Sequence, residues 1–275
     1  MSPISIPHGA VQVIDPYEEV FLLYTEGRPL EWKHNRVVSQ KKNYVEVTID
    51  DRTTVNIGQS QSLLSARGTT GSVLWDSSIM LSRLMITNRE WLGLSTEKTN
   101  VIELGSGCGL TGIALSSHVR LMALTDQASM IPHLWKNVKR NLGNQNSKVI
   151  VTELMWGEDI DKDIIRQHWD YVIASDCIFN ESINVSFVET LVKLCGGVGG
   201  DNSKTTRPAS TSDESGREDL QRTVVIIALE LRSDEVHSNF LEEMTVKRNF
   251  MMWRLPTSMY GSEFEKGYAV YVAWI

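Results

Sequence analysis

Short runs of consecutive apolar residues alternate with helix-like patterns along most of the chain. Strands are predicted at residues 101–104, 121–126, 148–156, 170–176 and 223–231, and helices at 110–118, 130–141, 160–168, 184–194 and 234–248. The predicted strands are almost continuously apolar, which is typical of strands with both faces buried. Separated by helices, they predict an α/β fold with a mainly parallel sheet that is covered on both faces.

The two ends of the chain show other patterns. Near the N-terminus the sequence predicts a short helix at 17–27, a β-hairpin at 44–50 and 53–60, and a helix at 76–94 with Asp76 as its N-cap. Two further strand-like runs, 250–256 and 267–275, have no helical pattern between them. They predict an antiparallel hairpin at the edge of the sheet.

Residues 196–221 are rich in glycine, serine, threonine and charged residues and contain almost no apolar ones. Such a segment buries too little surface to offset the entropy of ordering it, so we predict a flexible insertion. The expected organisation is an N-terminal extension with the hairpin at 1–72, followed by one main domain at 73–275 that carries the insertion.

Composition narrows the possible functions. A hydrophobic content of 41% and a charged content of 22% are ordinary for a soluble protein, and no apolar run approaches the roughly 20 residues of a membrane span. The net charge of -7 argues against a nucleic-acid-binding role and is compatible with a basic protein substrate. The first residues do not resemble a signal peptide. We therefore expect a cytoplasmic monomer, with the nucleus as an alternative location.

Cysteine and histidine are too sparse and scattered to predict a metal site. Cys108, Cys177 and Cys195 lie too far apart for a disulfide framework or a zinc cage. The six histidines include no pair with the H-x-x-x-H spacing of metal ligands. A metal-dependent mechanism is therefore not expected.

The stretch NVIELGSGCGLTGIAL, residues 100–115, places glycines directly after a predicted strand. From Gly105 they spell G-x-G-x-G, which suits a loop around an adenosyl-amino acid, and from Gly107 they spell the dinucleotide fingerprint G-x-G-x-x-G. The dinucleotide fold puts its first glycine at the turn immediately after the strand, and that residue is Gly105. Counted from there, the fingerprint requires a glycine where Leu110 stands. The first pattern fits better, and Gly112 is predicted to be a packing glycine.

Three residues near this turn are candidates for holding a nucleoside cofactor. Glu103, two residues before Gly105, is placed to approach an amino group, although backbone amides would satisfy it equally well. Asp126 closes the second strand and is placed to accept both hydroxyls of a ribose. Trp156 is a flat wall for an adenine or, alternatively, a core residue.

Five motifs in this order carry a resemblance to a known family. They are VLW at 73–75, ELGSGCGLTGI at 103–113, LTDQ at 124–127, LMWG at 154–157 and ASDCIFNE at 174–181. The set resembles the seven-β-strand methyltransferases that modify protein lysines, known as methyltransferase family 16. The resemblance covers roughly residues 55–275 and implies a Rossmann-like class I methyltransferase fold with S-adenosyl-L-methionine as cofactor.

The resemblance also implies roles for single residues on the cofactor side. Trp75 would line the pocket, and the turn from Gly105 through Ser106 to Gly107 would let the backbone approach the cofactor. Asp126 would bind the ribose and Trp156 would flank the adenine. Ser175 would add a contact at the end of the fourth strand.

On the acceptor side, the family's motif is an acidic residue followed three positions later by tyrosine. Here the motif is Asp176 and Phe179. Asp176 would position the lysine amine and Phe179 would supply an aromatic wall. The tyrosine hydroxyl is lost, which leaves any role for it in orienting the lysine open.

Within the family, the likeness is strongest to the fungal ribosomal lysine methyltransferases. It is carried by EEVFLLYTEGR, NIGQSQSLLSARGTTGSVLW, TDQ, DCIFNESI and LELRSDEVHSNFLE. The implied substrate is a large-subunit (60S) ribosomal protein of the L-one stalk, and the implied product is monomethyl-lysine. Three alternatives stay open: another protein or small-molecule acceptor, a nicotinamide-dependent oxidoreductase, and a non-catalytic interaction protein.

Overall fold

The computed structural model describes residues 3–26, 37–64, 70–143, 147–196 and 222–275. All but the first residue of the predicted insertion at 196–221 lies outside these ranges. The predicted division between an extension and a main domain at residue 72 remains a prediction.

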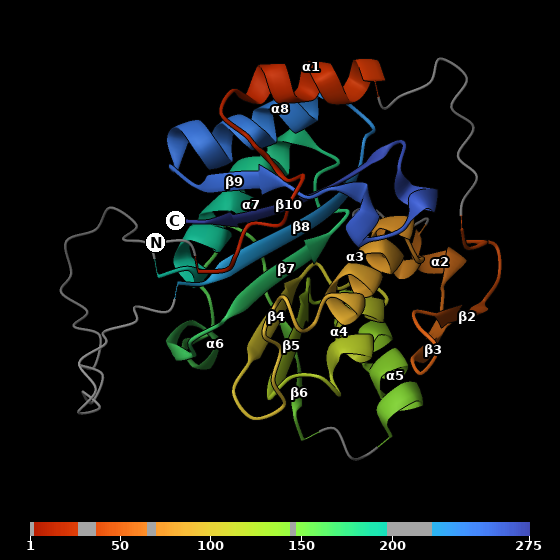
Figure 1. The fold of residues 1–275 in the computed structure, drawn as a ribbon. Helices are drawn as coiled ribbons and strands as arrows, with labels where there is room; N and C mark the ends of the chain where they lie inside the picture. The colour runs from red at the N-terminus through yellow and green to blue at the C-terminus, as the bar shows by residue number, and fades with distance from the viewer. Residues whose placement is uncertain (1–2, 27–36, 65–69, 144–146, 197–221) are drawn as a thin grey trace.

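An eight-stranded sheet forms the centre of the molecule (Figure 1), in the order β1-β9-β10-β8-β7-β4-β5-β6. Its strands are β1 Val11–Gln12, β4 Asn100–Leu104, β5 Leu121–Asp126, β6 Val149–Glu153, β7 Tyr171–Ser175, β8 Val224–Glu230, β9 Met251–Arg254 and β10 Tyr268–Trp274. The five strands from β6 to β8 are parallel, and β10 runs antiparallel to both β8 and β9. This arrangement confirms the predicted α/β fold class.

The sheet has one strand more than the seven expected. Val11 and Gln12 pair antiparallel with Trp253 and Arg254 of β9, so the N-terminal segment covers what would otherwise be an edge. Two residues leave no alternating apolar pattern, which is why the sequence did not predict this strand.

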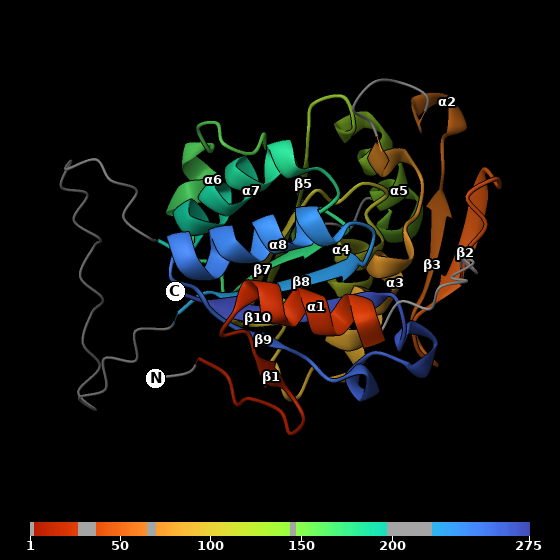
Figure 2. The ribbon, with the colours of Figure 1, turned by 90° about the horizontal axis from the view of Figure 1, so that it is seen from above.

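Helices cover both faces of the sheet (Figure 2). They are α1 Pro16–Glu26, α2 Gln61–Leu64, α3 Asp76–Thr87, α4 Leu110–Leu115, α5 Ile131–Leu142, α6 Lys162–Arg166, α7 Glu181–Leu194 and α8 Asp234–Glu242. One buried cluster lies between the sheet and helices α3, α4 and α5, and the other lies between the sheet and α1, α6, α7 and α8. Successive residues of β4 alternate between the clusters, with Val101 in the first and Ile102 in the second.

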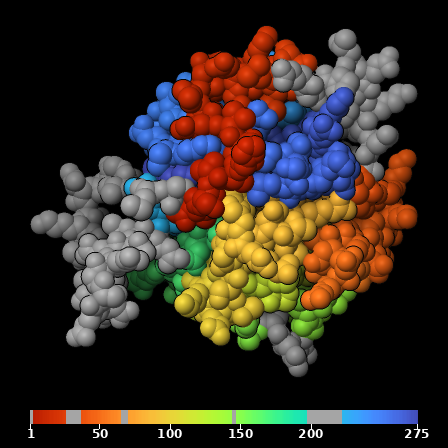
Figure 3. All heavy atoms as spheres, in the orientation of Figure 1, coloured from red at the N-terminus to blue at the C-terminus, as the bar shows by residue number. Residues whose placement is uncertain are grey.

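The predicted N-terminal hairpin is present as β2 Tyr44–Thr48 and β3 Thr54–Gly58. It packs on α5 and adds to the molecular surface beside α3 (Figure 3). Asn137 of α5 pairs with Gly58 in both directions, since its amide donates to the Gly58 carbonyl (3.0 Å) and its oxygen accepts from the Gly58 N–H (2.9 Å). These bonds satisfy backbone groups at the end of the hairpin and fix it to helix α5.

One local prediction is wrong. The residue before α3 in the N-cap position is Trp75, and Asp76 lies in the first turn, where its carboxylate accepts from the Val37 N–H and the Tyr268 hydroxyl, both at 3.2 Å. The predicted antiparallel pairing of the last two strands is confirmed for β9 and β10, and two 3₁₀ helices, Thr257–Met259 and Ser262–Phe264, lie between them. Such three-residue helices are too short to show a helical period in the sequence.

Helix α8 also differs from its predicted extent. It ends at Glu242, and a π-helical turn, Glu243–Lys247, replaces its last predicted part. Among the described residues, no helix has the length and apolar character needed to cross a membrane, and no three potential metal ligands gather in one place.

Candidate active site

A cavity of about 350 Å³ opens at the carboxyl ends of the parallel strands, where open α/β sheets bind their ligands. Its volume lies in the range of small-molecule and cofactor sites. It is lined by residues 70, 71, 73–75 and 78 before and within α3, the turn 105–108, Leu110, residues 126 and 127, the segment 154–156, and residues 175–177, 179, 180, 183 and 186 around the start of α7. All but one of the predicted site residues line it; the exception is Glu103.

The glycine turn after β4 requires glycine at two positions. Gly105 and Gly107 have φ angles of 62° and 54°, which side-chain-bearing residues rarely adopt. A Cβ on Gly107 would lie 2.8 Å from the carbonyl oxygen of Gly71, and one on Gly105 would lie 2.9 Å from Cys177 Sγ and 3.0 Å from Trp156. The turn is therefore held between the Gly71 backbone on one side and Trp156 on the other.

Asp126 at the end of β5 faces this turn. One of its carboxylate oxygens accepts from the Gly107 N–H at 2.7 Å, and the other accepts from the Gln127 N–H at 2.8 Å. Burial raises the pKa of Asp126 above its ordinary value, against the opposing effect of these two hydrogen bonds. Each oxygen keeps a lone pair, so the carboxylate has capacity left to accept from two vicinal hydroxyls of a ribose.

Trp156 forms an apolar wall of the cavity beside Gly105. Its ring packs edge-on against Phe187 of α7, with ring centroids 4.8 Å apart. This contact fixes the ring plane, and Leu154 and Met155 extend the apolar surface. Trp156 therefore both packs against the core and presents a flat face of the kind that an adenine requires.

Ser106 and Glu103 hold the turn from below. The Ser106 N–H donates to the Thr125 carbonyl (2.9 Å) and the Ser106 hydroxyl accepts from the Thr125 N–H (3.1 Å), which joins the turn to β5. Glu103 is fully buried and accepts from the Gly112 N–H at 3.1 Å. Burial raises its pKa to about 7, and hydrogen bonds from Ser106, Thr111 and Gly112 oppose that rise. The structure thus places Glu103 behind the turn, outside the residues that line the cavity.

Gly112 is a packing glycine, as predicted. A Cβ there would lie 2.6 Å from Leu124 Cγ and 2.9 Å from the Glu103 carboxylate, because α4 crosses the sheet closely at this point. Gly112 does not line the cavity. The dinucleotide interpretation, which uses Gly112 as its third glycine, therefore finds no glycine open to a phosphate at that position.

Asp176, at the end of β7, forms an ion pair that the sequence did not predict. Its φ angle of 58° is unusual for a residue with a side chain, and its carboxylate is buried. Arg232 donates to both of its oxygens, at 2.7 and 2.5 Å, and also donates to Glu230 at 2.5 Å. Two carboxylates and one guanidinium leave this cluster with one net negative charge. Arg232 therefore fixes the Asp176 carboxylate in place as a hydrogen-bond acceptor.

Arg232 also joins this cluster to Trp75. The guanidinium carbon lies 4.7 Å from the Trp75 ring centroid, and the indole N–H donates to the Thr70 carbonyl at 3.0 Å. Burial acts to lower the pKa of Arg232, but the hydrogen bonds and charges of Asp176 and Glu230 outweigh it and raise the pKa. The sequence signal for Arg232 is its place directly after the fifth strand, at the same edge of the sheet as Asp176.

The remaining predicted residues lie at the opening. Ser175 ends β7 beside Asp176, and Phe179 is 43% exposed at the cavity mouth. We refer to Gly105, Gly107, Asp126 and Trp156 as the glycine half of the cavity. We refer to Trp75, Asp176 and Phe179, together with Glu230 and Arg232, which hold Asp176 from outside the cavity lining, as the arginine half. The glycine half fits an adenosyl group, and the arginine half offers negative charge and aromatic faces to a cation.

Comparison with known proteins gives one family. The model of a family described as lysine methyltransferase matches residues 56–200, which is more than half of the chain. This range includes both Trp75 and the glycine half, and it ends before Arg232.

Individual curated relatives have about 30% sequence identity to this chain, and the match covers only part of each of them. Protein-lysine N-methyltransferase EEF2KMT of Mus musculus is 29% identical over 69% of this chain and 53% of its own length. Protein-lysine methyltransferase METTL21E of Bos taurus is 30% identical over 46% of this chain and 43% of its own length. A Schizosaccharomyces pombe protein named as a diaminohydroxyphosphoribosylamino-pyrimidine deaminase is 35% identical over 58% of this chain, which is 39% of that protein. The chain spans about a third to a little over half of the curated relatives it matches.

A solved structure supports the fold independently. The structure of SMU.776 complexed with SAH aligns with 86% of this chain and 57% of its own chain, at a TM-score of 0.50 and 9% sequence identity. At this identity the likeness concerns the fold alone.

Proposed function

The chain belongs to the lysine methyltransferase family, and we propose that it transfers a methyl group from S-adenosyl-L-methionine to the amine of a protein lysine. The observation that carries this proposal is one cavity in which a nucleoside-shaped half adjoins a half that suits a cation. This chain matches less than half of the length of two of its relatives, so their names alone do not establish its activity. We base the proposed activity on the family and the site together.

The glycine half would bind the cofactor, which supplies a methyl group already activated on sulfur. Asp126 would accept from the ribose hydroxyls, and Trp156 would stack against the adenine. The absence of a Cβ at Gly107 permits the close approach of the Gly71 backbone, which fixes the turn that would face the cofactor. No base is needed to activate the donor, so the task of these residues is binding and orientation.

The arginine half would receive the lysine. Its net negative charge and the exposed Phe179 face attract the ammonium as it enters, while Arg232 stacks on Trp75. A free lysine has a pKa of about 10.4, and removal from water in the cavity favours its neutral, nucleophilic form. Since Arg232 holds both oxygens of Asp176, we assign Asp176 the role of positioning the amine.

For the substrate, we propose a large-subunit ribosomal protein of the L-one stalk, with a monomethyl-lysine as product. The support is the likeness of five segments to fungal ribosomal lysine N-methyltransferase 5, two of which, DCIFNESI and LELRSDEVHSNFLE, contain Asp176 and Arg232. We further propose that the protein acts as a cytoplasmic or nuclear monomer.

Transfer of labelled methyl groups to unmodified large ribosomal subunits tests both levels of the proposal. We expect label on one lysine of the stalk protein. The variant Asp176→Asn is expected to lose transfer while binding S-adenosylhomocysteine normally, because asparagine keeps the shape of aspartate and tolerates a positive φ. Label only on another protein would overturn the substrate. Thermal stabilisation by NADH but not by S-adenosylhomocysteine would overturn the activity itself.

A further inference from the structure

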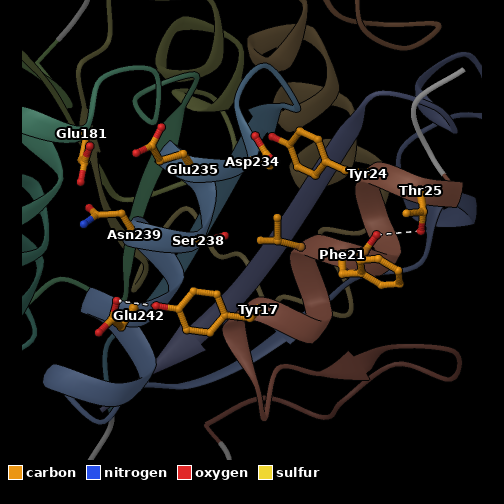
Figure 4. A pocket seen from close by; sticks show the side chains of 11 residues that line it. Tyr17, Phe21, Tyr24, Thr25, Glu181, Asp234, Glu235, Ser238, Asn239 and Glu242 are labelled. Carbon is orange, nitrogen blue, oxygen red and sulfur yellow. Dashed lines mark hydrogen bonds between the residues drawn. The ribbon is translucent and has the colours of Figure 1, made fainter. Parts of the chain in front are cut away.

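A second concavity, of about 520 Å³, lies outside the candidate active site, between α1 and α8. We call it the α1–α8 groove (Figure 4). Tyr17, Val20, Phe21, Tyr24 and Thr25 of α1 form one wall, and residues 234, 235, 238, 239 and 242 of α8 form the other, with Glu181 at one end. One wall is thus largely aromatic and the other largely acidic.

Helix α1 is fixed on its inner side. The buried carboxylate of Glu19 accepts from Arg254 Nε at 2.6 Å and from the Tyr271 hydroxyl at 3.1 Å, and Val20 is buried next to it. Its outer side chains have no such cover, since Tyr17 is 61% and Phe21 is 66% exposed. The aromatic wall is therefore rigidly mounted and open to solvent.

The acidic wall brings together carboxylates from two helices. Asp234 and Glu235 lie in the first turn of α8, and Glu181 lies in the first turn of α7. In the part of the chain that the structure describes, these three form no ion pair and no lysine, arginine or histidine lines the groove. Glu242 accepts from the Tyr17 hydroxyl at 3.2 Å and joins the two walls at the far end.

Two connections join the groove to the candidate active site. Asn180 lines the cavity and the next residue, Glu181, lines the groove. Arg232 belongs to the arginine half, and Asp234, two residues later, lines the groove. A peptide whose lysine enters the cavity past Phe179 therefore meets the groove on this side of the opening.

We propose that the α1–α8 groove binds a basic segment that flanks the acceptor lysine of the protein substrate. Arginine and lysine side chains lay their apolar stems on rings such as Tyr17 and Phe21 and direct their charges to nearby carboxylates. A second copy of this chain is a poorer occupant, because its net charge of -7 is of the same sign as the groove. The proposal rests on the proposed function and extends it to the recognition of basic sequence.

The test compares two labelled peptides, each with one central lysine. One has arginines on both sides of the lysine, and the other has glutamines in their place. Fluorescence anisotropy with the full chain and S-adenosylhomocysteine measures binding without requiring transfer. We expect the arginine peptide to bind more tightly and to lose that advantage as salt rises.

The groove variant is Glu181→Gln with Asp234→Asn and Glu235→Gln, and we expect it to weaken the arginine peptide on the order of tenfold. The glutamine peptide and S-adenosylhomocysteine should bind as to wild type. The matched control neutralises three exposed carboxylates elsewhere, with Glu46→Gln, Asp51→Asn and Glu97→Gln, and should bind as wild type does.

Three other outcomes would decide against the proposed role of the groove. Equal weakening by the control variant would show a general charge effect. An affinity that falls with Phe21→Ala but not with the groove variant would indicate an apolar partner, and self-association that the groove variant abolishes would indicate a second copy. Groove-dependent peptide binding without any methyl transfer would leave the groove standing and refute the proposed function.

Discussion

The glycine half and the arginine half meet at one cavity, although Glu230 and Arg232 lie outside its lining, and the two halves are held by different kinds of contact. In the glycine half, backbone amides and the absence of side chains define the shape, as at Gly107, whose N–H bonds Asp126. In the arginine half, charged side chains from β7 and β8 hold one another through Arg232. Backbone shape suits a ligand common to many enzymes, whereas a side-chain cluster is readily altered to suit one acceptor.

This difference predicts that variants of the two halves have different effects on cofactor binding and on methyl transfer. Damage to the glycine half should abolish cofactor binding. Damage to the arginine half should reduce transfer while cofactor binding persists. A variant of either half that affects both properties equally would break the comparison.

The largest effect is expected from Gly107→Ala. The new Cβ would stand 2.8 Å from the Gly71 carbonyl oxygen, a backbone atom that cannot turn away, and the residue would keep its φ of 54°. We expect at least a 100-fold loss of S-adenosylhomocysteine affinity by calorimetry, since about 1–2 kcal/mol of backbone strain adds to the steric conflict.

Gly93→Ala is the matched control for this variant. Gly93 has a φ of 62°, but nothing lies within 4 Å of a Cβ placed there. It therefore carries the strain without the steric conflict. Normal cofactor affinity in this control, with loss in Gly107→Ala, would assign the effect to the approach of Gly71.

Arg232→Ala is expected to have the next largest effect. It leaves the buried carboxylates of Asp176 and Glu230 without their shared partner, and breaking a buried pair in this way costs about 3–5 kcal/mol. We expect kcat to fall by more than about 100-fold with little change in S-adenosylhomocysteine affinity. Arg232→Lys should be intermediate, because an ammonium keeps the charge but not the two-pronged bond.

The control is Arg248→Ala, which removes a more exposed ion pair with Glu189 at 3.1 Å. Surface pairs of this kind contribute about 0–1 kcal/mol, so kcat should be unchanged. If Arg232→Ala lost cofactor affinity in parallel with kcat, the arginine half would not be a separate unit.

The sequence predicted the glycine half better than the arginine half, because the first depends on local patterns and the second on contacts between distant residues. The glycine turn, Asp126 and Trp156 lie at strand ends that apolar periodicity locates, and the φ requirement of Gly105 is local. The bond between Arg232 and Asp176 joins residues 56 positions apart, and no local pattern encodes it. Glu103 faces helix α4, where it accepts from the Gly112 N–H, and does not line the cavity. A strand residue two positions before a turn can face either side, and the sequence alone does not decide between them.

Glu103→Gln tests the support behind the glycine half. Burial raises the pKa of folded Glu103 from 4.5 to about 7. The unfolded chain therefore loses this proton at lower pH than the folded chain does, so wild-type stability falls as pH rises from about 4.5 to 7 and then levels off. Relative to Glu103→Gln, the loss should reach about 3 kcal/mol, at about 1.4 kcal/mol for each pKa unit.

Chemical denaturation at several pH values measures this difference. Glu97→Gln, at an exposed position, controls for the removal of one negative charge. A constant difference between wild type and Glu103→Gln across this range would mean that Glu103 is ionised in the folded protein throughout. In either case kcat should change little, because Glu103 does not line the cavity.

Phe179 gives the smallest expected effect and the sharpest test of whether the arginine half is complete. Phe179→Ala removes an exposed aromatic face, which contributes about 0.5–1 kcal/mol to cation binding, so kcat/KM should fall by about two- to fivefold.

Phe179→Tyr restores the hydroxyl of the family motif at a position that is 43% exposed, where water competes for its hydrogen bonds. A new hydrogen bond contributes little net free energy at such a position, and we expect kcat to change by less than about twofold. A tenfold rise in kcat for Phe179→Tyr would instead show that the hydroxyl helps to orient the lysine, and that Asp176 and Phe179 alone do not complete the arginine half.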